Sequence, residues 1–167
     1  MEIRTDKVRI QVGCGNKYFP GFVNVDRHGA DDDLDVRSDA FPLPFPTDYA
    51  DELWAIHIFE HLHRQEAPKA LYEWFRVLKP GGKLVLEMPC LDKIAQLIVN
   101  GEKNIRLTLL GLYGDPRDPK PDMMHQWCWG KDEITDALSN VAFLKIEIKE
   151  PVFHIPERDF RVEAYKP

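Results

Sequence analysis

Short apolar runs and one amphipathic stretch alternate along the first half of the chain. Five runs have the length of a strand and are separated by turn signals or helical segments: 8–12, 22–26, 33–37, 52–57 and 83–88. Between the last two, apolar residues recur at helical spacing from Leu71 to Leu78, which predicts a helix over about 64–78. Lys79-Pro80-Gly81-Gly82 is expected to end that helix. Strands that alternate with helices are typical of an α/β fold with a parallel sheet.

The second half of the pattern is less regular. It predicts helices over about 91–100 and 131–139, and two terminal strands near 143–149 and 158–165. No helix fits between the two strands, so we expect an antiparallel pair that closes the sheet edge. The proline-rich segment at about 111–130 is too long for an ordinary connector, which favours a lid or a substrate loop.

Size and charge narrow the class of protein. The 167 residues suit a single domain, 1–167, with a core of its own. A net charge of −6 argues against broad binding to nucleic acid or to an anionic membrane. Three scattered cysteines make no disulfide framework, and we see no cationic apolar leader and no apolar run of membrane-span length. We therefore expect a cytoplasmic protein without a membrane partner.

A glycine turn follows the first predicted strand. Gly13 and Gly15 flank Cys14, and Asp26 ends the second predicted strand. Glycines at the carboxyl edge of a strand let a ligand lie against bare backbone, and an acid after the next strand is placed to accept hydrogen bonds from a ribose. Alone this pair of features is a weak signal.

The link between the first two predicted strands is unusually short. Only residues 16–21 separate Gly15 from the second run, and Pro20-Gly21 indicates a turn. Parallel strands joined through a helix need about 10–12 residues or more. The first helix is therefore expected to be shortened or absent, which weakens a nicotinamide or flavin interpretation because a pyrophosphate binds a helix N-terminus.

Further motifs follow in a fixed order. They are Asp39-Ala40 before Leu43-Pro44-Phe45, then Glu60-His61-Leu62, then Arg76-Val77-Leu78-Lys79-Pro80-Gly81-Gly82. With the glycine turn and Asp26, this series over residues 8–89 resembles the class I S-adenosylmethionine (SAM)-dependent methyltransferases of the type 11 kind. The resemblance implies a Rossmann-like, seven-stranded sheet, mostly parallel with an antiparallel C-terminal edge strand, and SAM as the cofactor.

The resemblance also assigns site residues. It places Gly13, Cys14 and Gly15 against the methionyl part of SAM, Asp26 at the ribose, Asp39 and the Ala40 N–H at the adenine, and His57 near the sulfonium. An acid that the family often has at the position of Gln11 is missing. The implied reaction is methyl transfer to a small-molecule acceptor, such as a sugar or another hydroxylated metabolite, with S-adenosylhomocysteine as product and no metal.

A hydroxyl acceptor needs a base. The predicted catalytic residues are His125 first, with Asp122 close enough to orient it, and His57 second. For His125 a hydrogen-bonded loop residue is an equally good interpretation. The two tryptophans of the segment, Trp127 and Trp129, are expected to pack it on the core.

Two other functions stay open. The chain could be a SAM-binding partner subunit without activity of its own. His57, Glu60 and His61 also spell H-x-x-E-H, a signature of zinc hydrolases that requires both histidines on one helical face. Because His57 follows a predicted strand, His61 and its neighbour His63 are better explained by ordinary contacts in a helix N-terminal turn. Cys90 is expected to be a small, partly buried residue rather than a nucleophile.

Overall fold

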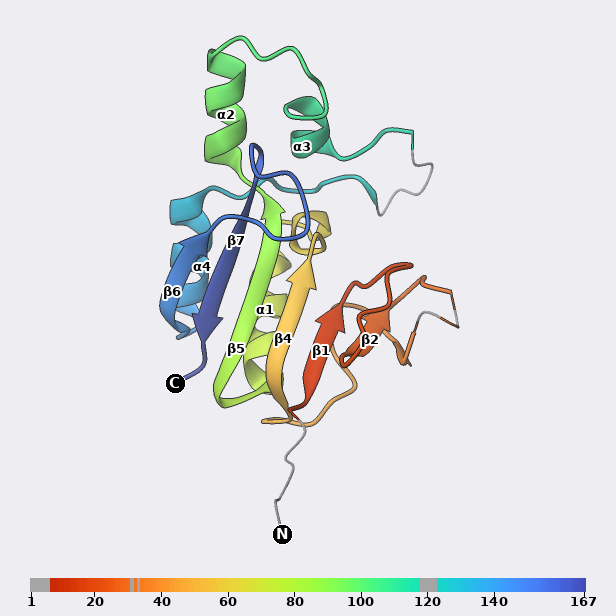
Figure 1. The fold of residues 1–167 in the computed structure, drawn as a ribbon. Helices are drawn as coiled ribbons and strands as arrows, with labels where there is room; N and C mark the ends of the chain where they lie inside the picture. Colours follow the sequence, from red (N-terminus) through yellow and green to blue (C-terminus); the bar gives the residue numbers. More distant parts are fainter. Residues whose placement is uncertain (1–6, 31, 33, 118–122) are drawn as a thin grey trace.

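The computed structural model describes residues 7–30, 32, 34–117 and 123–167. Its strands are β1 (Arg9–Val12), β2 (Val23–Asp26), β3 (Val36–Arg37), β4 (Ala50–Ile56), β5 (Leu78–Pro89), β6 (Leu144–Lys149) and β7 (Asp159–Tyr165). Its helices are η2 (Phe59–His61), α1 (Ala67–Val77), α2 (Leu91–Val99), α3 (Leu109–Tyr113) and α4 (Lys131–Asn140). The strands form one 7-stranded sheet in the order β3-β2-β1-β4-β5-β7-β6 (Figure 1).

The direction of the strands confirms the predicted α/β sheet. The five strands β3, β2, β1, β4 and β5 pair in parallel. Strand β7 runs antiparallel to both β5 and β6. The reversed strand, β7, therefore lies between β5 and β6, and β6 forms the edge of the sheet.

The first crossover contains no helix, as its length predicted. Between β1 and β2 the chain makes only turns. The side chain of Asn24 holds this short link: its Oδ1 accepts the Phe19 N–H at 2.8 Å, and its Nδ2 donates to the carbonyls of Phe19 and Phe22. A buried amide thus satisfies backbone groups that a helix would otherwise pair.

Several predicted boundaries shift. Helix α1 begins at Ala67, with a proline in its first turn, rather than near residue 64. Strand β5 begins at Leu78 and so includes the Lys79–Gly82 run, which we expected to be a break between helix and strand. The predicted third strand shortens to Val36–Arg37, and residue 33 lies outside the described residues. Residues 111–113 belong to α3, so the irregular segment begins after them.

Helices α1 and α4 cover one face of the sheet (Figure 1). Alternate strand residues point into this layer, including Ile10, Leu53 and Leu86, and they join Trp74 of α1 and Leu138 of α4 in one buried cluster. No helix among the described elements covers the opposite face. Its strand residues are mostly polar or aromatic: Arg9, Gln11, Glu52, Trp54, Lys83, Glu87, Arg161 and Glu163.

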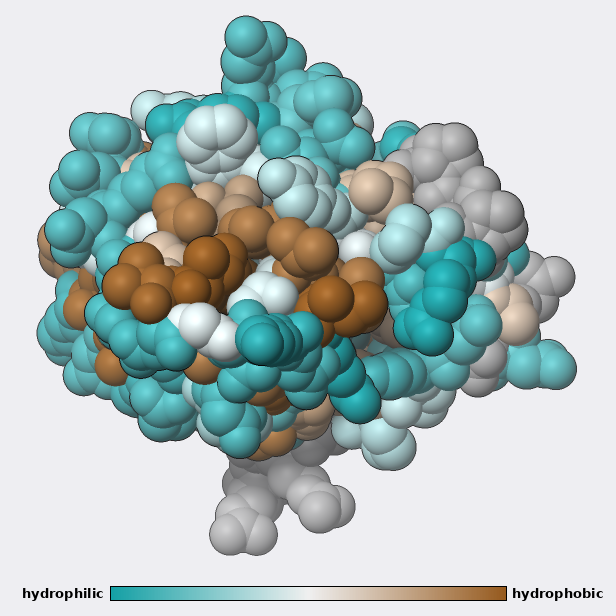
Figure 2. Space-filling view, turned by 90° about the horizontal axis from the view of Figure 1, so that it is seen from above, coloured by the Kyte–Doolittle hydropathy of each residue, from teal (hydrophilic) through white to brown (hydrophobic). Residues whose placement is uncertain are grey.

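Helices α2 and α3 and the loop between β6 and β7 lie beyond the carboxyl ends of β4 and β5 (Figure 1). Seen from this end, apolar side chains gather on part of the surface (Figure 2). Exposed apolar residues of α2, α3 and the turn between them are Leu91, Ile98, Val99, Ile105, Leu109 and Tyr113. Within the described part of the chain, none of the helices has the length and apolar character that a membrane span needs.

Candidate functional site

The glycine turn after β1 is held against β2. The N–H groups of Gly13 and Cys14 donate to the Val25 carbonyl at 2.8 and 3.2 Å. Both glycines have a left-handed φ, +70° at Gly13 and +58° at Gly15. A Cβ on Gly15 would meet nothing within 4 Å, so the space on this side of the residue is open, and its predicted contact with the cofactor stays a prediction. A Cβ on Gly13 would lie 2.6 Å from Cγ1 of Ile58, so this glycine makes room for a neighbouring side chain instead.

The Asp26 carboxylate ties the turn to the end of β2. Its Oδ2 accepts the Gly15 N–H at 2.8 Å, and its Oδ1 accepts the N–H groups of His28 and Gly29 at 2.6 and 3.0 Å. A carboxylate can accept further hydrogen bonds through its remaining lone pairs. Asp26 therefore has a structural role, and its predicted contact with a ribose stays a prediction.

The segment after β3 brings the second acid to the same edge of the sheet. The Ser38 N–H donates to the Asp26 carbonyl at 3.0 Å. The exposed Asp39 carboxylate forms an ion pair with Arg27. The carbonyl of Ala40 accepts the indole N–H of Trp74 at 2.9 Å, which fixes this loop on α1. The predicted adenine contacts of Asp39 and Ala40 stay predictions, at an edge where their side chains or backbone are accessible.

A cavity of about 840 Å³ opens near the carboxyl end of β4. Four of the six histidines line it, together with several cationic and apolar residues: His57, His61, His125, His154, Arg106, Arg117, Arg158, Leu110, Met123, Phe153 and Ile155. Both predicted catalytic residues, His57 and His125, lie in this wall. Among the predicted cofactor contacts, only His57 lines it.

His57 is held between two carboxylates. It follows β4 with a left-handed φ of +53°, and its N–H donates to the Glu87 carbonyl at 2.7 Å. Its Nδ1 lies 2.8 Å from Glu60 Oε1, and its Nε2 lies 3.5 Å from Asp159 Oδ2. Burial alone would lower the pKa of His57, but the charges of Glu60 and Asp159 outweigh it and raise that pKa to about 9. The ring is therefore a cation near neutral pH and a poor proton acceptor.

Glu60 lies beneath the cavity and is fully buried. Burial alone would raise its pKa, but the neighbouring His57, His61 and His125 lower it to about 2. The short contact with His57 is an ion pair without good hydrogen-bond alignment, because neither Glu60 oxygen has a hydrogen-bond partner among the described residues. Its backbone carbonyl accepts the N–H groups of Gln126 and Trp127, which attaches the His125 segment to η2.

His125 lies in the cavity wall with a fixed orientation. Its Nδ1 lies 2.9 Å from the Gly111 carbonyl, and its Nε2 lies 4.0 Å from Glu60 Oε1. Burial lowers the pKa of His125, so the ring is neutral near pH 7. Asp122, which we expected to orient the ring, lies outside the described residues. Gly111 and Glu60 are the groups that face its two nitrogens.

Other expectations for this segment have mixed outcomes. Trp129 is fully buried and stacks on Phe59 with ring centroids 4.9 Å apart, which confirms its packing role. Trp127 is 40% exposed, with its indole N–H donated to Glu133 at 2.9 Å. Cys90 is fully buried, and burial raises its pKa, so it is not a nucleophile.

Sequence reasoning missed the carboxylates on the far side of the cavity. Glu87 accepts the N–H groups of Val152 and Phe153 at 2.9 and 2.8 Å and so holds the β6–β7 loop in place. Its signal was an acid inside the apolar run of β5. Asp159 accepts the Ile155 N–H at 3.0 Å and pairs with Arg158. No sequence pattern distinguished Asp159 or His154 from surface residues.

The H-x-x-E-H motif does not form the arrangement of a zinc hydrolase. Glu60 and His61 lie on the three-residue turn η2, whereas His57 precedes it in a left-handed conformation. The two motif histidines therefore share no helix, and the geometry gives the peptidase interpretation no support.

The order of the strands, the reversed β7 and the glycine turn at the end of β1 define the fold of class I SAM-dependent methyltransferases. A family model for a methyltransferase domain matches residues 14–86. Open backbone at Gly15 and the acids at the ends of β2 and β3 fit this cofactor, and the domain and fold together imply SAM.

Solved structures with the same fold include several methyltransferases. A SAM-dependent methyltransferase from Thermotoga maritima is 15% identical, with a TM-score of 0.66 over 96% of this chain and 83% of that one. One from Archaeoglobus fulgidus is 16% identical, with a TM-score of 0.67 over 96% and 86%. A chain from the complex of the Haloferax volcanii Trm112 methyltransferase activator with a methyltransferase is 16% identical, with a TM-score of 0.62 over 97% and 83%. A comparison with curated proteins finds no match.

Proposed function

We propose that the chain transfers a methyl group from SAM to a small hydroxylated acceptor, such as a sugar, bound in the histidine-lined cavity. The supporting observation is the position of this cavity. Phe153 of its wall contacts Phe19 of the link after Gly15, with ring centroids 5.5 Å apart, and Ile58, which follows His57 of the wall, packs on Gly13 of the glycine turn. The cavity volume of about 840 Å³ is within the range of small-molecule sites.

The protein's part in this reaction is mainly alignment and the exclusion of water. When bound, SAM supplies an electrophilic methyl group on a positively charged sulfur. The cavity wall would hold the acceptor hydroxyl in line with that methyl group. Because His57 is itself cationic, we assign loss of the acceptor's proton to the Nε2 side of His125.

The proposal is tested with SAM labelled in its methyl group. The purified chain is incubated with labelled SAM and a panel of sugars, other hydroxylated metabolites and metabolite extracts, and label is sought in the acceptor fraction. We expect turnover to fall by about 100-fold or more in His125→Ala, the range for loss of a proton-transfer group, with the Kd for SAM unchanged. His63→Ala is the matched control, because His63 is exposed outside the cavity. SAM binding without labelling of any acceptor would refute the proposal.

A second candidate is a SAM-binding subunit that acts only with a partner. One observation favours it: within the described residues no helix covers the face of the sheet opposite α1 and α4, so a partner chain would pack directly on the side chains and loops that close this face. One structure of the same fold comes from a complex with a methyltransferase activator. Multiple turnovers by the isolated chain would exclude this candidate.

A further inference from the structure

Glu60 presents an ionised carboxylate that the protein leaves incompletely paired. Its side chain is 1% exposed, and in the described part of the chain neither oxygen has a hydrogen-bond partner. The one close cation, His57 Nδ1, lies 2.8 Å from Oε1. A buried carboxylate without full compensation is unfavourable. A second cationic partner, close to Oε2, would therefore stabilise this carboxylate.

The orientation of His125 adds a second electron pair directed at the same point. A carbonyl oxygen only accepts, so the 2.9 Å contact with Gly111 requires the proton on Nδ1. In the neutral ring, Nε2 then has a free lone pair, 4.0 Å from Glu60 Oε1. Nε2 and the Glu60 carboxylate are both acceptors, and no donor of the described residues bridges them, although His57 Nδ1 lies beside Oε1. Histidines that bind metals commonly donate their other N–H to a backbone carbonyl in this way.

His61 completes the group. Its Nδ1 is buried and has no hydrogen-bond partner among the residues that the structure describes. Its ring centroid lies 4.9 Å from that of His125. Each of the residues Glu60, His61 and His125 offers one ligand atom, and these three atoms lie within 4.8 Å of one another. Bonds of about 2.0–2.1 Å in a tetrahedral site place ligand atoms roughly 3.4 Å apart, so small side-chain movements would close the group on an ion.

We propose that Glu60, His61 and His125 form a binding site for a divalent first-row metal ion of the zinc type. Two imidazoles and one carboxylate are a donor set that such ions favour. His61 and His125 both line the cavity, so the remaining coordination position faces the space assigned to the acceptor. The role of the ion rests on the proposed function and replaces one step of it. With the ion bound, Nε2 of His125 is a ligand and not a base; the ion would hold the acceptor's oxygen, and a hydroxyl bound to it would lose its proton to water more readily.

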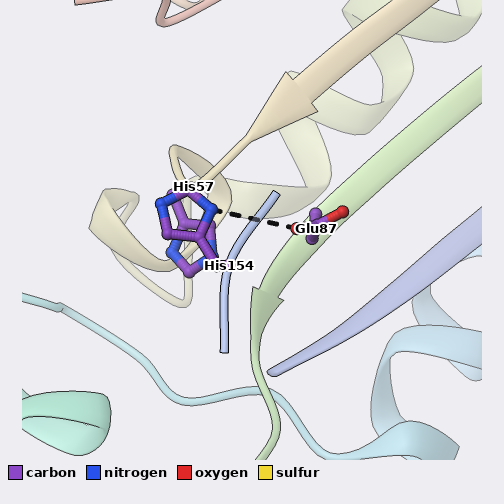
Figure 3. Close-up of side chains that lie close together, drawn as sticks. All are labelled: His57, Glu87 and His154. Carbon is purple, nitrogen blue, oxygen red and sulfur yellow. Dashed lines mark ion pairs between the residues drawn. The ribbon is translucent and has the colours of Figure 1, made fainter. Parts of the chain in front are cut away.

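A neighbouring group of His57, Glu87 and His154 has similar spacing (Figure 3). The ring centroids of His57 and His154 lie 3.7 Å apart, with the ring planes tilted by 38°. Both oxygens of Glu87 already accept backbone N–H groups of the β6–β7 loop. His57 lies between the carboxylates of Glu60 and Asp159. Two of the three side chains are therefore engaged by other groups, and only His154 has a nitrogen, Nδ1, that is free of both roles, so we assign no ion to this group.

The site is tested with the full chain after treatment with a chelator. Titration with Zn²⁺ by calorimetry and with Co²⁺ by visible absorption should give one equivalent, with the strong absorption of a tetrahedral site. Glu60→Gln, His61→Ala and His125→Ala should each weaken Zn²⁺ binding by about 100-fold or more, whereas His63→Ala and His154→Ala should leave it within about threefold. Circular dichroism establishes that each variant is folded. Glu60→Gln removes a buried charge without changing the shape of the side chain, so it serves if an alanine variant unfolds.

Two results would overturn the site. One is the absence of stoichiometric Zn²⁺ or Co²⁺ binding, and the other is binding that His154→Ala abolishes and His61→Ala does not. SAM binding by the metal-free protein, measured separately, tells the two proposals apart. SAM binding without Zn²⁺ binding refutes the metal site alone, and Zn²⁺ binding without SAM binding refutes the proposed function alone.

Discussion

At the scale of single residues, the two glycines of the turn have the same backbone conformation but different surroundings. Gly13→Ala would combine a left-handed φ with a Cβ overlapping Ile58, whereas Gly15→Ala would have the unfavourable φ alone. We expect Gly15→Ala to lower the free energy of unfolding by about 1–2 kcal/mol and Gly13→Ala by about 1–3 kcal/mol more. Urea unfolding measures both values.

The double variant Gly13→Ala/Ile58→Ala separates the two effects at Gly13. Removing the Ile58 side chain relieves the overlap, so the double variant should lose less stability than the sum of the single changes. For SAM binding we expect the opposite order, with the larger loss of affinity in Gly15→Ala than in Gly13→Ala, because the open space is at Gly15. Equal losses of stability at both glycines would contradict this account.

The two acids at the sheet edge also differ in what they support. Asp26 accepts three backbone N–H groups, so Asp26→Ala should lower stability by about 1–3 kcal/mol as well as weaken SAM binding. Asp39 is exposed and paired only with Arg27 in the described structure. Asp39→Ala should change stability by less than about 0.5 kcal/mol and raise the Kd for SAM about tenfold, the effect of one charge-assisted hydrogen bond.

Calorimetry with SAM and thermal unfolding of the same samples measure these effects. The matched control is Glu147→Ala, an exposed carboxylate paired with Lys149 at 2.8 Å on another part of the surface. An unchanged Kd for SAM in Asp39→Ala would remove this residue from the cofactor site.

At the scale of elements, the sequence pattern predicted those helices and links that depend mainly on interactions between residues close in sequence. The helical spacing of Leu71 and Trp74 gave α1, and the short link after Gly15 gave a crossover without a helix. The Lys79–Gly82 run was different. Its composition indicates a break, and strand β4 pairs with Leu78 and again from Lys83 but with none of the four residues between, where Gly81 takes a left-handed φ. The run bonds instead to the residue after β7: the Gly81 N–H donates to the Lys166 carbonyl, and the Lys166 N–H donates to the Gly82 carbonyl. These long-range hydrogen bonds, which no local pattern encodes, keep the run within β5.

The site was predictable only in part for the same reason. Motif order located Gly15, Asp26, His57 and His125 near one end of the sheet. That Glu60 faces three histidines depends on a contact between η2 and the segment at 125–127, more than 60 positions apart in sequence. No periodicity or spacing encodes such a contact, and the same holds for His154 over His57.

Glu73 connects helix α1 to the loop that follows the predicted adenine contacts, Asp39 and Ala40. From α1 it accepts the Leu43 N–H at 2.7 Å and pairs with Arg76 at 2.7 Å, which holds the loop that follows Asp39 and Ala40. The hydrogen bonds from Arg76 hold the pKa of Glu73 below its ordinary value of 4.5, against the opposing effect of burial. We expect Glu73→Gln to lower the free energy of unfolding by about 1–2 kcal/mol at pH 7.

The sign of the pH dependence follows from the lowered pKa. The native state binds the proton more weakly than the unfolded state, so the contribution of Glu73 is full above pH 4.5. It falls as the pH drops below that value and is lost once the pH passes the lower pKa of the folded state. Urea unfolding of the wild-type protein and of Glu73→Gln should show that the difference between their free energies of unfolding shrinks from pH 7 to pH 3. A difference that stays constant would mean that the carboxylate charge is not what holds the loop.

At the scale of the whole molecule, the sheet has two unlike faces. The face covered by α1 and α4 holds the apolar core, and the opposite face is closed by side chains of the sheet and its loops. There Trp54 contacts the rings of Phe22 and Phe153, and the Arg161 guanidinium lies 5.0 Å from the Trp54 ring centroid. Glu163 pairs with Lys149 at 2.8 Å on the same face. Aromatic stacking and ion pairs thus replace the helix layer that a β–α–β crossover would supply.

The missing crossover helix also decides which cofactor the whole molecule can bind. A dinucleotide needs a helix N-terminus after β1 for its pyrophosphate, and the described chain has only turns there. S-adenosylhomocysteine carries no phosphate, and its predicted contacts are the glycine turn and the two acids. At about 100 times its Kd, a ligand that binds only the native state stabilises it by roughly 2.7 kcal/mol, which for a chain of this size raises Tm by about 5–10 °C. We expect that shift with S-adenosylhomocysteine and none with NAD⁺ at the same concentration, measured by differential scanning fluorimetry. A shift with NAD⁺ alone would contradict both the cofactor and the argument from the first crossover.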